Sequence, residues 1–465
     1  MNREKILVLA DLGGCPPYHF YENIAKNYNI ITYIPRPFAI TQSHFDIINN
    51  FSIAVINDEE HFNFLEDFNK KDDIYWAMEE HNLDENTVSE RIAEIGSFFN
   101  VSAITTNNEL FVVPVATASE KLDLNGAGLI GSKKARDKYL MRKAFNNADL
   151  KNVKCEPVND YKDLEKVIKN IGFPFILKPT YLASSIGVTL FEARDNYKEK
   201  FNELVSFINS ITVPDSVKPS CKFIAEEYLI GNPKEWYGSD LYGDYVSVEG
   251  IMKKGEYYPL SITDKTPQSG FTETSHITPS VLDIEKQKII FDAAKKANES
   301  LDLQYCSTHT EMKLLPNLQI GLIETAARFG GWNIIPNIDK VKEINSPSLL
   351  IDALTDKDIG EELITISTME TRKFISDFHL YITDDKSLET DISFNGIVDV
   401  TKYVDSSVII NNYNEIEKGT FLKLDNFKAF NGVCEIELIS NNSNNIVNSI
   451  HSIHNNFELV KGDQN

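Results

Sequence analysis

Short apolar runs alternate with amphipathic stretches through the first hundred residues of the chain. Residues 18–28 have helical spacing of apolar positions, and four apolar runs have the length of buried strands, at 5–10, 30–34, 53–56 and 103–105. This βαβ rhythm predicts a small open parallel sheet. Ligands of such sheets bind beyond the carboxyl ends of the strands. The loops at 11–17 and 105–110 are therefore either parts of a pocket or ordinary turns.

A lysine-rich amphipathic stretch comes next in the chain. Ser132 is a candidate N-cap, which predicts one helix with residues 133–148 as its body. Lys138 shares a helix face with Met141 and Phe145. This lysine therefore either extends past the core into solvent or points into a site.

Residues 172–179 form a short apolar run that ends in Lys178 and Pro179 and predicts a buried strand. A hydroxyl-rich loop at 180–187 and a return strand at 188–191 follow. Such a strand, lysine and small-residue turn predict a phosphate cradle, because backbone N–H groups and hydroxyls donate while the ammonium neutralises charge. A plain hairpin is the alternative. The pattern is not a Walker loop, which needs GxxxxGK[ST].

The apolar run at 222–231 predicts an edge-like strand that crosses into a loop at Gly231. Backbone groups left free at such a crossing can bind the edge of an adenine, with Tyr228 and Leu229 packed on its faces. A polar loop at 264–276 contains, in its last four residues, two ionisable side chains three positions apart, Glu273 and His276. A lone histidine in a loop is usually just solvated, so the role of this pair stays open.

Two extended runs at 308–315 and 320–326 predict a hairpin joined by a four-residue turn. Pairing Leu315 with Ile320 places Lys313 opposite Leu322 and, two positions further, opposes two carboxylates, Glu311 and Glu324. Like charges at directly opposed strand positions repel. A cation between them reverses that interaction, and Mg2+ prefers such hard oxygen ligands. The alternative is a solvated hairpin whose glutamates splay into water.

The C-terminal region predicts a second α+β unit without a site-like cluster of side chains. A helix near 347–354 is expected to close the central region before this unit. From about residue 372, the unit is expected to have strands at 374–382, 396–400, 408–411, 421–424 and 432–438 and a last helix at 444–457. The unit is expected either to shape a pocket rim or to make contacts in a homodimer. Four regions are expected in all: 1–130, 131–230, 231–355 and 356–465.

Length and composition narrow the class of protein. A chain of 465 residues is too long for one ordinary core. The net charge of -23 argues against nucleic-acid or anionic-membrane partners, which need a basic face. Five scattered cysteines without a CxxC pair favour reduced thiols in a cytoplasm. No apolar run approaches membrane length, and the N-terminus has no signal-peptide pattern.

The order of these segments resembles the ATP-grasp carboxylate-amine ligases, in which ATP lies between two α+β subdomains. More closely, it resembles the L-amino acid α-ligases, in particular those that join L-alanine to anticapsin in the dipeptide antibiotic bacilysin. The strings that carry this resemblance are ADLGGCPP, IPRPFAIT, AITTNNELF, LKPTYLASSIGVTL, GFTETSHITPS and AARFGGWNIIPNI. The implied fold is an α+β ATP-grasp fold with an N-terminal βαβ domain and a C-terminal α+β subdomain.

The resemblance implies a role for individual residues. The implied nucleotide contacts are Lys138, Lys178, Leu182, Ser184, Ser185, Glu226, Glu227, Tyr228, Leu229 and Gln268. Glu311 and Glu324 are implied ligands of Mg2+, which Mn2+ can replace. The implied catalytic or substrate residues are Glu273, His276, Arg328, Gly331 and Trp332. Two positions depart from the family: Ala326 replaces a common metal-binding Asn, and the loop with Glu235, expected near the ribose, differs.

The implied reaction joins two unprotected L-amino acids at the cost of ATP. The carboxylate of a small amino acid such as L-alanine attacks the γ-phosphate, and the amine of a bulkier one attacks the resulting acyl phosphate. Such a step needs charge neutralisation by metal, Lys and Arg rather than a protein nucleophile. The implied partners are thus ATP and two amino acids. The alternatives are an ATP-grasp ligase for a different acid or amine and a catalytically silent nucleotide-binding protein.

Overall fold

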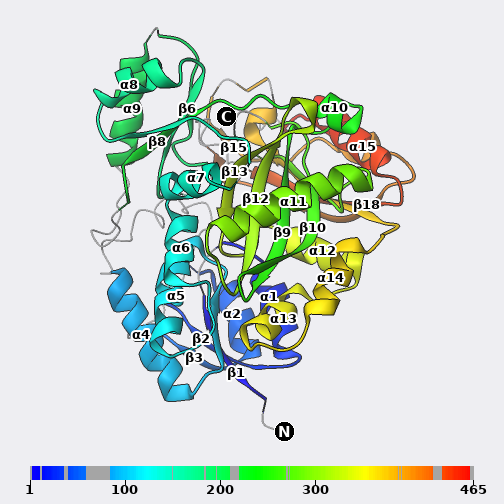
Figure 1. Ribbon diagram of the computed structural model, residues 1–465. Helices are drawn as coiled ribbons and strands as arrows, with labels where there is room; N and C mark the ends of the chain where they lie inside the picture. Colours follow the sequence, from blue (N-terminus) through cyan, green and yellow to red (C-terminus); the bar gives the residue numbers. More distant parts are fainter. Residues whose placement is uncertain are drawn as a thin grey trace.

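In the computed structural model, the described residues are 3–10, 13–35, 40–58, 84–148, 150–182, 185–194, 196–209, 219–268, 271, 273–385, 387–388, 390–422 and 432–460. Figure 1 shows the N-terminal unit at the bottom, a small subdomain with α8 and α9 at the upper left, and a large sheet between and to the right of them. No helix among these residues is long and apolar enough to cross a membrane. All five cysteines are free thiols.

The N-terminal unit is the predicted parallel sheet, in the order β3-β2-β1-β4. Its strands are β1 (Lys5–Leu9), β2 (Asn29–Tyr33), β3 (Ser52–Ile56) and β4 (Ala103–Thr106). Its helices are α1 (Pro17–Ala25), α2 (Gln42–Phe51), α4 (Glu85–Phe99) and α5 (Val112–Lys121). The chain leaves β1 toward β2 on one side, while β4 pairs on the other side. The crevice beyond β1 and β4 is therefore the topological switch point at which such sheets bind ligands.

The predicted helix at 133–148 is wrong as a single element. The chain forms α6 (Leu129–Arg136) and α7 (Lys138–Asn146), separated by Asp137 in an extended conformation. Asp137 Oδ1 accepts hydrogen bonds from the backbone N–H of Tyr139, at 3.0 Å, and of Leu140, at 3.1 Å. Asp137 rather than Ser132 is thus the N-cap of the helix that carries Lys138.

The small subdomain contains a four-stranded sheet in the order β5-β8-β6-β7. Its strands are β5 (Cys155–Val158), β6 (Phe175–Pro179), β7 (Thr189–Phe191) and β8 (Phe223–Glu227), covered by α8 (Asp163–Asn170) and α9 (Tyr197–Asn209). The expected edge position of the 222–231 run is wrong, because β8 lies between β5 and β6. Only the residues after Glu227 leave the sheet.

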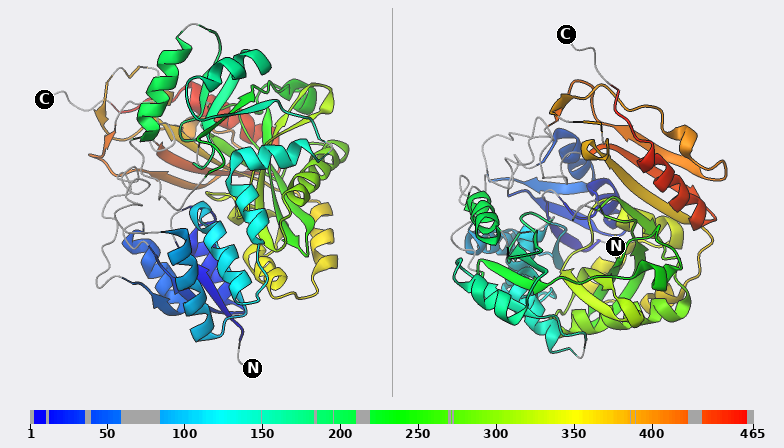
Figure 2. Two further views of the ribbon diagram at one scale, coloured as in Figure 1. Left: turned by 60° about the vertical axis from the view of Figure 1, so that its left-hand side comes forward. Right: turned by 90° about the horizontal axis from the view of Figure 1, so that it is seen from above.

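An eight-stranded sheet in the order β13-β12-β9-β10-β11-β14-β18-β16 forms the centre of the molecule. Its strands are β9 (Tyr245–Lys253), β10 (Glu256–Asp264), β11 (Ser275–Thr278), β12 (Cys306–Leu314), β13 (Ile320–Ala326), β14 (Phe374–Tyr381), β16 (Ile409–Glu415) and β18 (Gly432–Ser440). The sheet continues across the boundary expected near residue 356, through the pairing of β11 with β14. Figure 2 shows β14 and β18 extending this sheet into the C-terminal part of the chain.

Helices surround this sheet, and a small ribbon completes the C-terminal part. The helices are α10 (Pro233–Tyr237), α11 (Ile284–Ser300), α12 (Ile334–Lys342), α13 (Ser346–Leu354), α14 (Gly360–Thr368) and α15 (Ser443–Asn455). The ribbon pairs β15 (Ile392–Ser393) with β17 (Phe421–Leu422). The strand expected at 396–400 is wrong, since that segment makes only an isolated bridge between Ile397 and Leu459.

Candidate active site

The hairpin of β12 and β13 opposes Glu311 and Glu324, as the sequence predicts. The predicted pairing nearer the turn is wrong by one residue, because Leu314 rather than Leu315 pairs with Ile320. Ile323 is then an extra residue in β13, and this bulge restores the register before the two glutamates. Both side chains are partly buried. Two facing carboxylates are a suitable donor set for a hard divalent cation.

Lys138 points into this site rather than into solvent. Its Nζ lies 3.2 Å from Glu324 Oε2 and donates to the backbone carbonyl of Leu182 at 2.7 Å. Burial by itself would raise the pKa of Glu324, but the charges of Lys138 and Lys178 lower that pKa below its ordinary value. Glu324 is therefore ionised and ready to bind a cation.

Lys178 lies near the end of β6 and forms a buried ion triad with Glu226 and Arg142. The sequence did not reveal this triad. Lys178 Nζ lies 2.8 Å from Glu226 Oε2, and Arg142 Nε lies 2.6 Å from Glu226 Oε1. Arg142 also donates to the carbonyl of Ile323, the bulge residue, at 3.1 Å. Burial would raise the pKa of Glu226, but the two cations hold it at about 2. The side chain of Glu226 thus positions Lys178. This role is separate from the nucleotide contact that is expected of the Glu226 backbone.

His309 and Glu249 form a second group that sequence reasoning missed. His309 lies opposite Glu249 of β9 and opposite Ala326 of β13. Its Nδ1 contacts the fully buried Glu249, and its Nε2 lies 3.3 Å from Glu311 Oε1. Burial would lower the pKa of His309, but the two carboxylates raise it to about 10. An imidazolium therefore lies beside Glu311. Residues 309 and 311 are two positions apart on β12, so their side chains lie on the same face of the strand.

The loop after β4 contributes Glu109 to the site. Glu109 lies at the start of the short helix η3 (Glu109–Phe111), and its Oε2 lies 2.8 Å from Arg328 Nε. Arg136 Nη1 approaches its other oxygen at 4.0 Å. The switch point of the N-terminal sheet predicts a pocket at this loop, but no pattern in the sequence singles out Glu109. In the loop after β1, the first two residues, 11 and 12, lie outside the described part of the chain.

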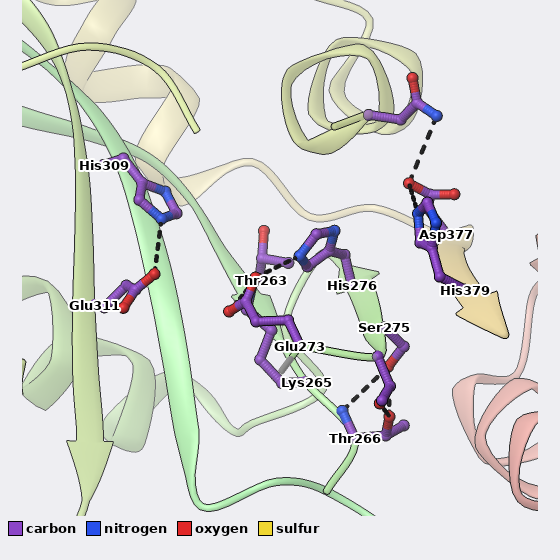
Figure 3. Close-up of polar contacts among 12 residues, drawn as sticks. Thr263, Lys265, Thr266, Glu273, Ser275, His276, His309, Glu311, Asp377 and His379 are labelled. Atoms are coloured by element: carbon purple, nitrogen blue, oxygen red, sulfur yellow. Dashed lines mark hydrogen bonds and ion pairs between the residues drawn. The ribbon is translucent and has the colours of Figure 1, made fainter. Parts of the chain in front are cut away.

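Glu273 and His276 lie together, with Lys265 as an unforeseen third member (Figure 3). Lys265 is fully buried, and its Nζ lies 3.3 Å from Glu273 Oε1. The other oxygen, Oε2, lies 3.0 Å from His276 Nε2, while His276 Nδ1 is buried without a hydrogen-bond partner. Burial would raise the pKa of Glu273, but Lys265 and His276 lower it. Burial, followed by the charge of Lys265, lowers the pKa of His276 to about 4.

Trp332 is held between two histidines in a conformation that aromatic residues rarely adopt. Its φ is +54°, its ring centroid lies 3.9 Å from that of His379 in a stacked pair, and 4.8 Å from that of His276. A side chain at Gly330 would approach His309 Nδ1 to 2.7 Å, whereas Gly331 has open space around it. Gly330 thus serves packing, and only Gly331 leaves room for a ligand.

The other predicted nucleotide residues lie on three separate segments of the chain. Leu182 is buried and packs with Ile186, Ser185 is exposed with φ +57°, and Ser184 lies outside the described residues. Glu227 faces Lys151 at 3.9 Å, and Tyr228 and Leu229 follow it as the chain leaves β8. Gln268 is partly exposed, three residues after Lys265. Glu235 accepts a hydrogen bond from the backbone N–H of Asn317 in the β12–β13 turn, at 3.1 Å.

An ATP-grasp domain model matches residues 171–335. The match spans Lys178, Glu226 and both facing glutamates. An L-amino acid ligase from Bacillus licheniformis has the same fold, with a TM-score of 0.71 over 100% of both chains at 14% sequence identity. The fold and the site together define an ATP-grasp enzyme.

Sequence relatives define the family more narrowly. The chain is 46% identical over 455 residues to an alanine–anticapsin ligase of Bacillus subtilis (strain 168), and the match covers 96% of each chain. An alanine–anticapsin ligase of Bacillus amyloliquefaciens is also 46% identical to the chain, and this match again covers 96% of each chain. The chain belongs to the alanine–anticapsin ligase family, and the predicted resemblance to L-amino acid α-ligases is confirmed.

Proposed function

We propose that this enzyme forms an α-peptide bond between two unprotected L-amino acids, a small N-terminal one such as L-alanine and a bulkier C-terminal one. ATP is converted to ADP and phosphate through an acyl phosphate. The observation that supports this best is the pair of facing carboxylates, Glu311 and Glu324, with Lys138 3.2 Å from Glu324 and the charge of Lys178 also acting on Glu324. The relatives named alanine–anticapsin ligase support the choice of substrates.

In the first step, a carboxylate oxygen of the small amino acid bonds to the γ-phosphorus, and the bond from that phosphorus to the ADP oxygen breaks. Both reactants are anions, so the step depends on positive charge around them. Lys138 and Lys178 supply two such charges. Glu311 and Glu324 would hold Mg2+, or Mn2+ in its place, and the bound ion would supply positive charge to neutralise phosphate oxygens. His309 offsets the charge of Glu311 and keeps it oriented.

In the second step, the amine of the other amino acid bonds to the acyl carbon, and the bond from that carbon to the phosphate oxygen breaks. Arg328 is suited to bind the oxyanion and the departing phosphate through its forked guanidinium. Ionised Glu273 can hold an ammonium group. Neutral His276, with its Nε2 directed at Glu273 and its Nδ1 unpaired, can accept the proton that the attacking amine loses.

The remaining predicted residues would surround the nucleotide and the substrate side chain. We propose that Leu182, Ser184 and Ser185 cover the phosphates, while Glu226 to Leu229 and Gln268 line the adenine end. Trp332 would form a wall of the pocket for the N-terminal side chain, and Gly331 would let the backbone approach the substrate. The five free thiols are consistent with work in a reducing cytoplasm, and a homodimer is a further expectation.

Release of ADP and phosphate with all pairs of L-amino acids tests this function. We expect release to require two amino acids and Mg2+ and to be highest when L-alanine is one of them. Glu324→Gln should abolish metal-dependent release while leaving the fold intact, whereas Glu361→Gln, at an exposed helix position, should change neither. Release of AMP would refute the acyl-phosphate route. ATP turnover only with another acid or amine would show an ATP-grasp ligase of different specificity.

A further inference from the structure

Three ligand-type side chains meet on one face of the C-terminal part of the central sheet. Asp377 and His379 are two residues apart on β14 and therefore point to the same side. Glu435 of β18 lies directly opposite His379 in the antiparallel pairing. A carboxylate oxygen of each acid and an imidazole nitrogen lie within 4.8 Å of one another. Figure 3 shows Asp377 and His379 apart from the Glu311 and Glu273 groups.

The polar atoms of this cluster lack the partners that buried charges need. Asp377 is fully buried, and its Oδ1 has no hydrogen-bond partner. His379 Nε2 lies 3.8 Å from Asp377 Oδ2, within ion-pair range, but makes no hydrogen bond. Asn333 donates to Glu435 Oε1 at 2.6 Å and to Asp377 Oδ2 at 3.5 Å. Within the described part of the chain, no lysine or arginine forms an ion pair with either carboxylate. Two neighbouring carboxylates without a cation are costly to bury.

We propose that Asp377, His379 and Glu435 bind a divalent transition-metal cation, for which Zn2+ is the best match. One imidazole and two carboxylates are a ligand set that Zn2+ accepts, with water in the fourth position. Ligand atoms around tetrahedral Zn2+ lie roughly 3.4 Å apart, so small side-chain rotations close the present cluster onto an ion. The Glu311 and Glu324 pair offers only oxygen and suits Mg2+ instead.

The position of this site connects it to substrate selection, a part of the inference that rests on the proposed function. His379 stacks on Trp332, and Asn333, which orients Glu435, directly follows Trp332 in the chain. Tyr18 of the N-terminal unit donates to Asn333 Oδ1 at 2.9 Å. A bound cation would fix the ring of His379 and thereby the Trp332 wall. The metal site would thus join three parts of the molecule behind the substrate pocket.

Metal binding can be measured without turnover. Glu324→Gln protein, dialysed against chelator, removes the other metal site and is titrated with Zn2+ in competition with a chromophoric chelator. We expect one Zn2+ per chain, and Co2+ in its place should give visible absorption of a low-coordinate site. His379→Gln and Asp377→Asn in this background should weaken binding by at least about 100-fold. His451→Ala, at an exposed histidine of α15, should not change it.

Thermal melting provides a second readout that is independent of ligase activity. Zn2+ should raise the Tm of Glu324→Gln protein but not that of the same protein with His379→Gln added. If Asp377→Asn fails to fold, Glu435→Gln takes its place in the same comparison. Absence of a tight Zn2+ site in Glu324→Gln, or its persistence in both His379→Gln and Asp377→Asn, would overturn the proposal. The cluster would then instead hold a proton shared between its two carboxyl groups.

Discussion

Replacing Glu226 by Gln removes one negative charge from the buried triad with Arg142 and Lys178 and hardly changes its shape. Because Glu226 is 6% exposed, water cannot replace the lost charge. Two cations would then face each other around a neutral amide. Lys178 would no longer be held at the end of β6, where we expect it to contact ATP phosphates.

Two estimates of the unfolding free energy lost in Glu226→Gln agree. The pKa of Glu226 falls from 4.5 to about 2 because its two cationic neighbours outweigh burial; at 1.36 kcal/mol per unit this is roughly 3 kcal/mol. Breaking a buried ion pair by removing one partner typically costs about 3 to 5 kcal/mol. Since the folded-state pKa lies below the ordinary value, this stabilisation is complete above pH 4.5 and is lost as the pH falls toward 2.

The assay is urea unfolding followed by circular dichroism, with ADP binding measured on the same variants. Glu227→Gln is the matched control for stability alone, since Glu227 is itself proposed to lie at the adenine end. Its partly exposed carboxylate faces Lys151 at 3.9 Å and should contribute under about 1 kcal/mol. We expect Glu226→Gln to lose roughly 3 kcal/mol of unfolding free energy and to bind ADP more weakly. Equal stability of the two variants would refute the structural role of the triad.

Three further predictions concern the substrate side of the site. Trp332→Ala should admit N-terminal side chains larger than that of alanine, as the substrate profile will show; a loss of about 3 to 5 kcal/mol with unchanged specificity would make Trp332 only a core residue. Lys265→Met should move the acid limb of the pH profile of kcat from near pH 4 toward 6.5. The variant removes the positive charge of Lys265, which lowers the pKa of His276, so that pKa should rise. An unmoved acid limb would exclude His276 as the group that titrates. Gly330→Ala should lower the melting temperature and Gly331→Ala should not, since only the former creates a contact below 3.0 Å; equal melting of both would contradict the packing role of Gly330.

Local patterns were sufficient to predict the parts of the fold that depend on neighbouring residues. The β1–β4 sheet follows from alternating apolar runs, and the facing of Glu311 and Glu324 follows from strand pairing across a short turn. The second prediction succeeded through two compensating features, since the turn begins one residue early and the bulge at Ile323 restores the register. The helical spacing predicts that Lys138 shares a face with Met141, but it does not predict the break at Asp137 just before this helix.

Side-chain partners that are distant in sequence were not predictable in this way. Glu249 meets His309 only because β9 pairs with β12, and Lys265 meets Glu273 across a long loop. Each of these residues looks like an ordinary polar position in its own segment. The Asp377, His379 and Glu435 cluster likewise forms only when β14 and β18 pair. A single sequence records no such pairing, so the C-terminal part appeared to have no site.

The pairing of β11 with β14 has a consequence for how this family can diversify. His276 on β11 is hydrogen-bonded along its backbone to the strand that carries Asp377, so the last hundred residues are not a module that can be exchanged without effect. A chimera that takes this segment from a relative would also acquire a new backbone neighbour for His276. Because we propose that His276 faces the substrates, we expect exchange there to change which amino acids are accepted, while β12, β13, Lys138 and Lys178 stay as they are.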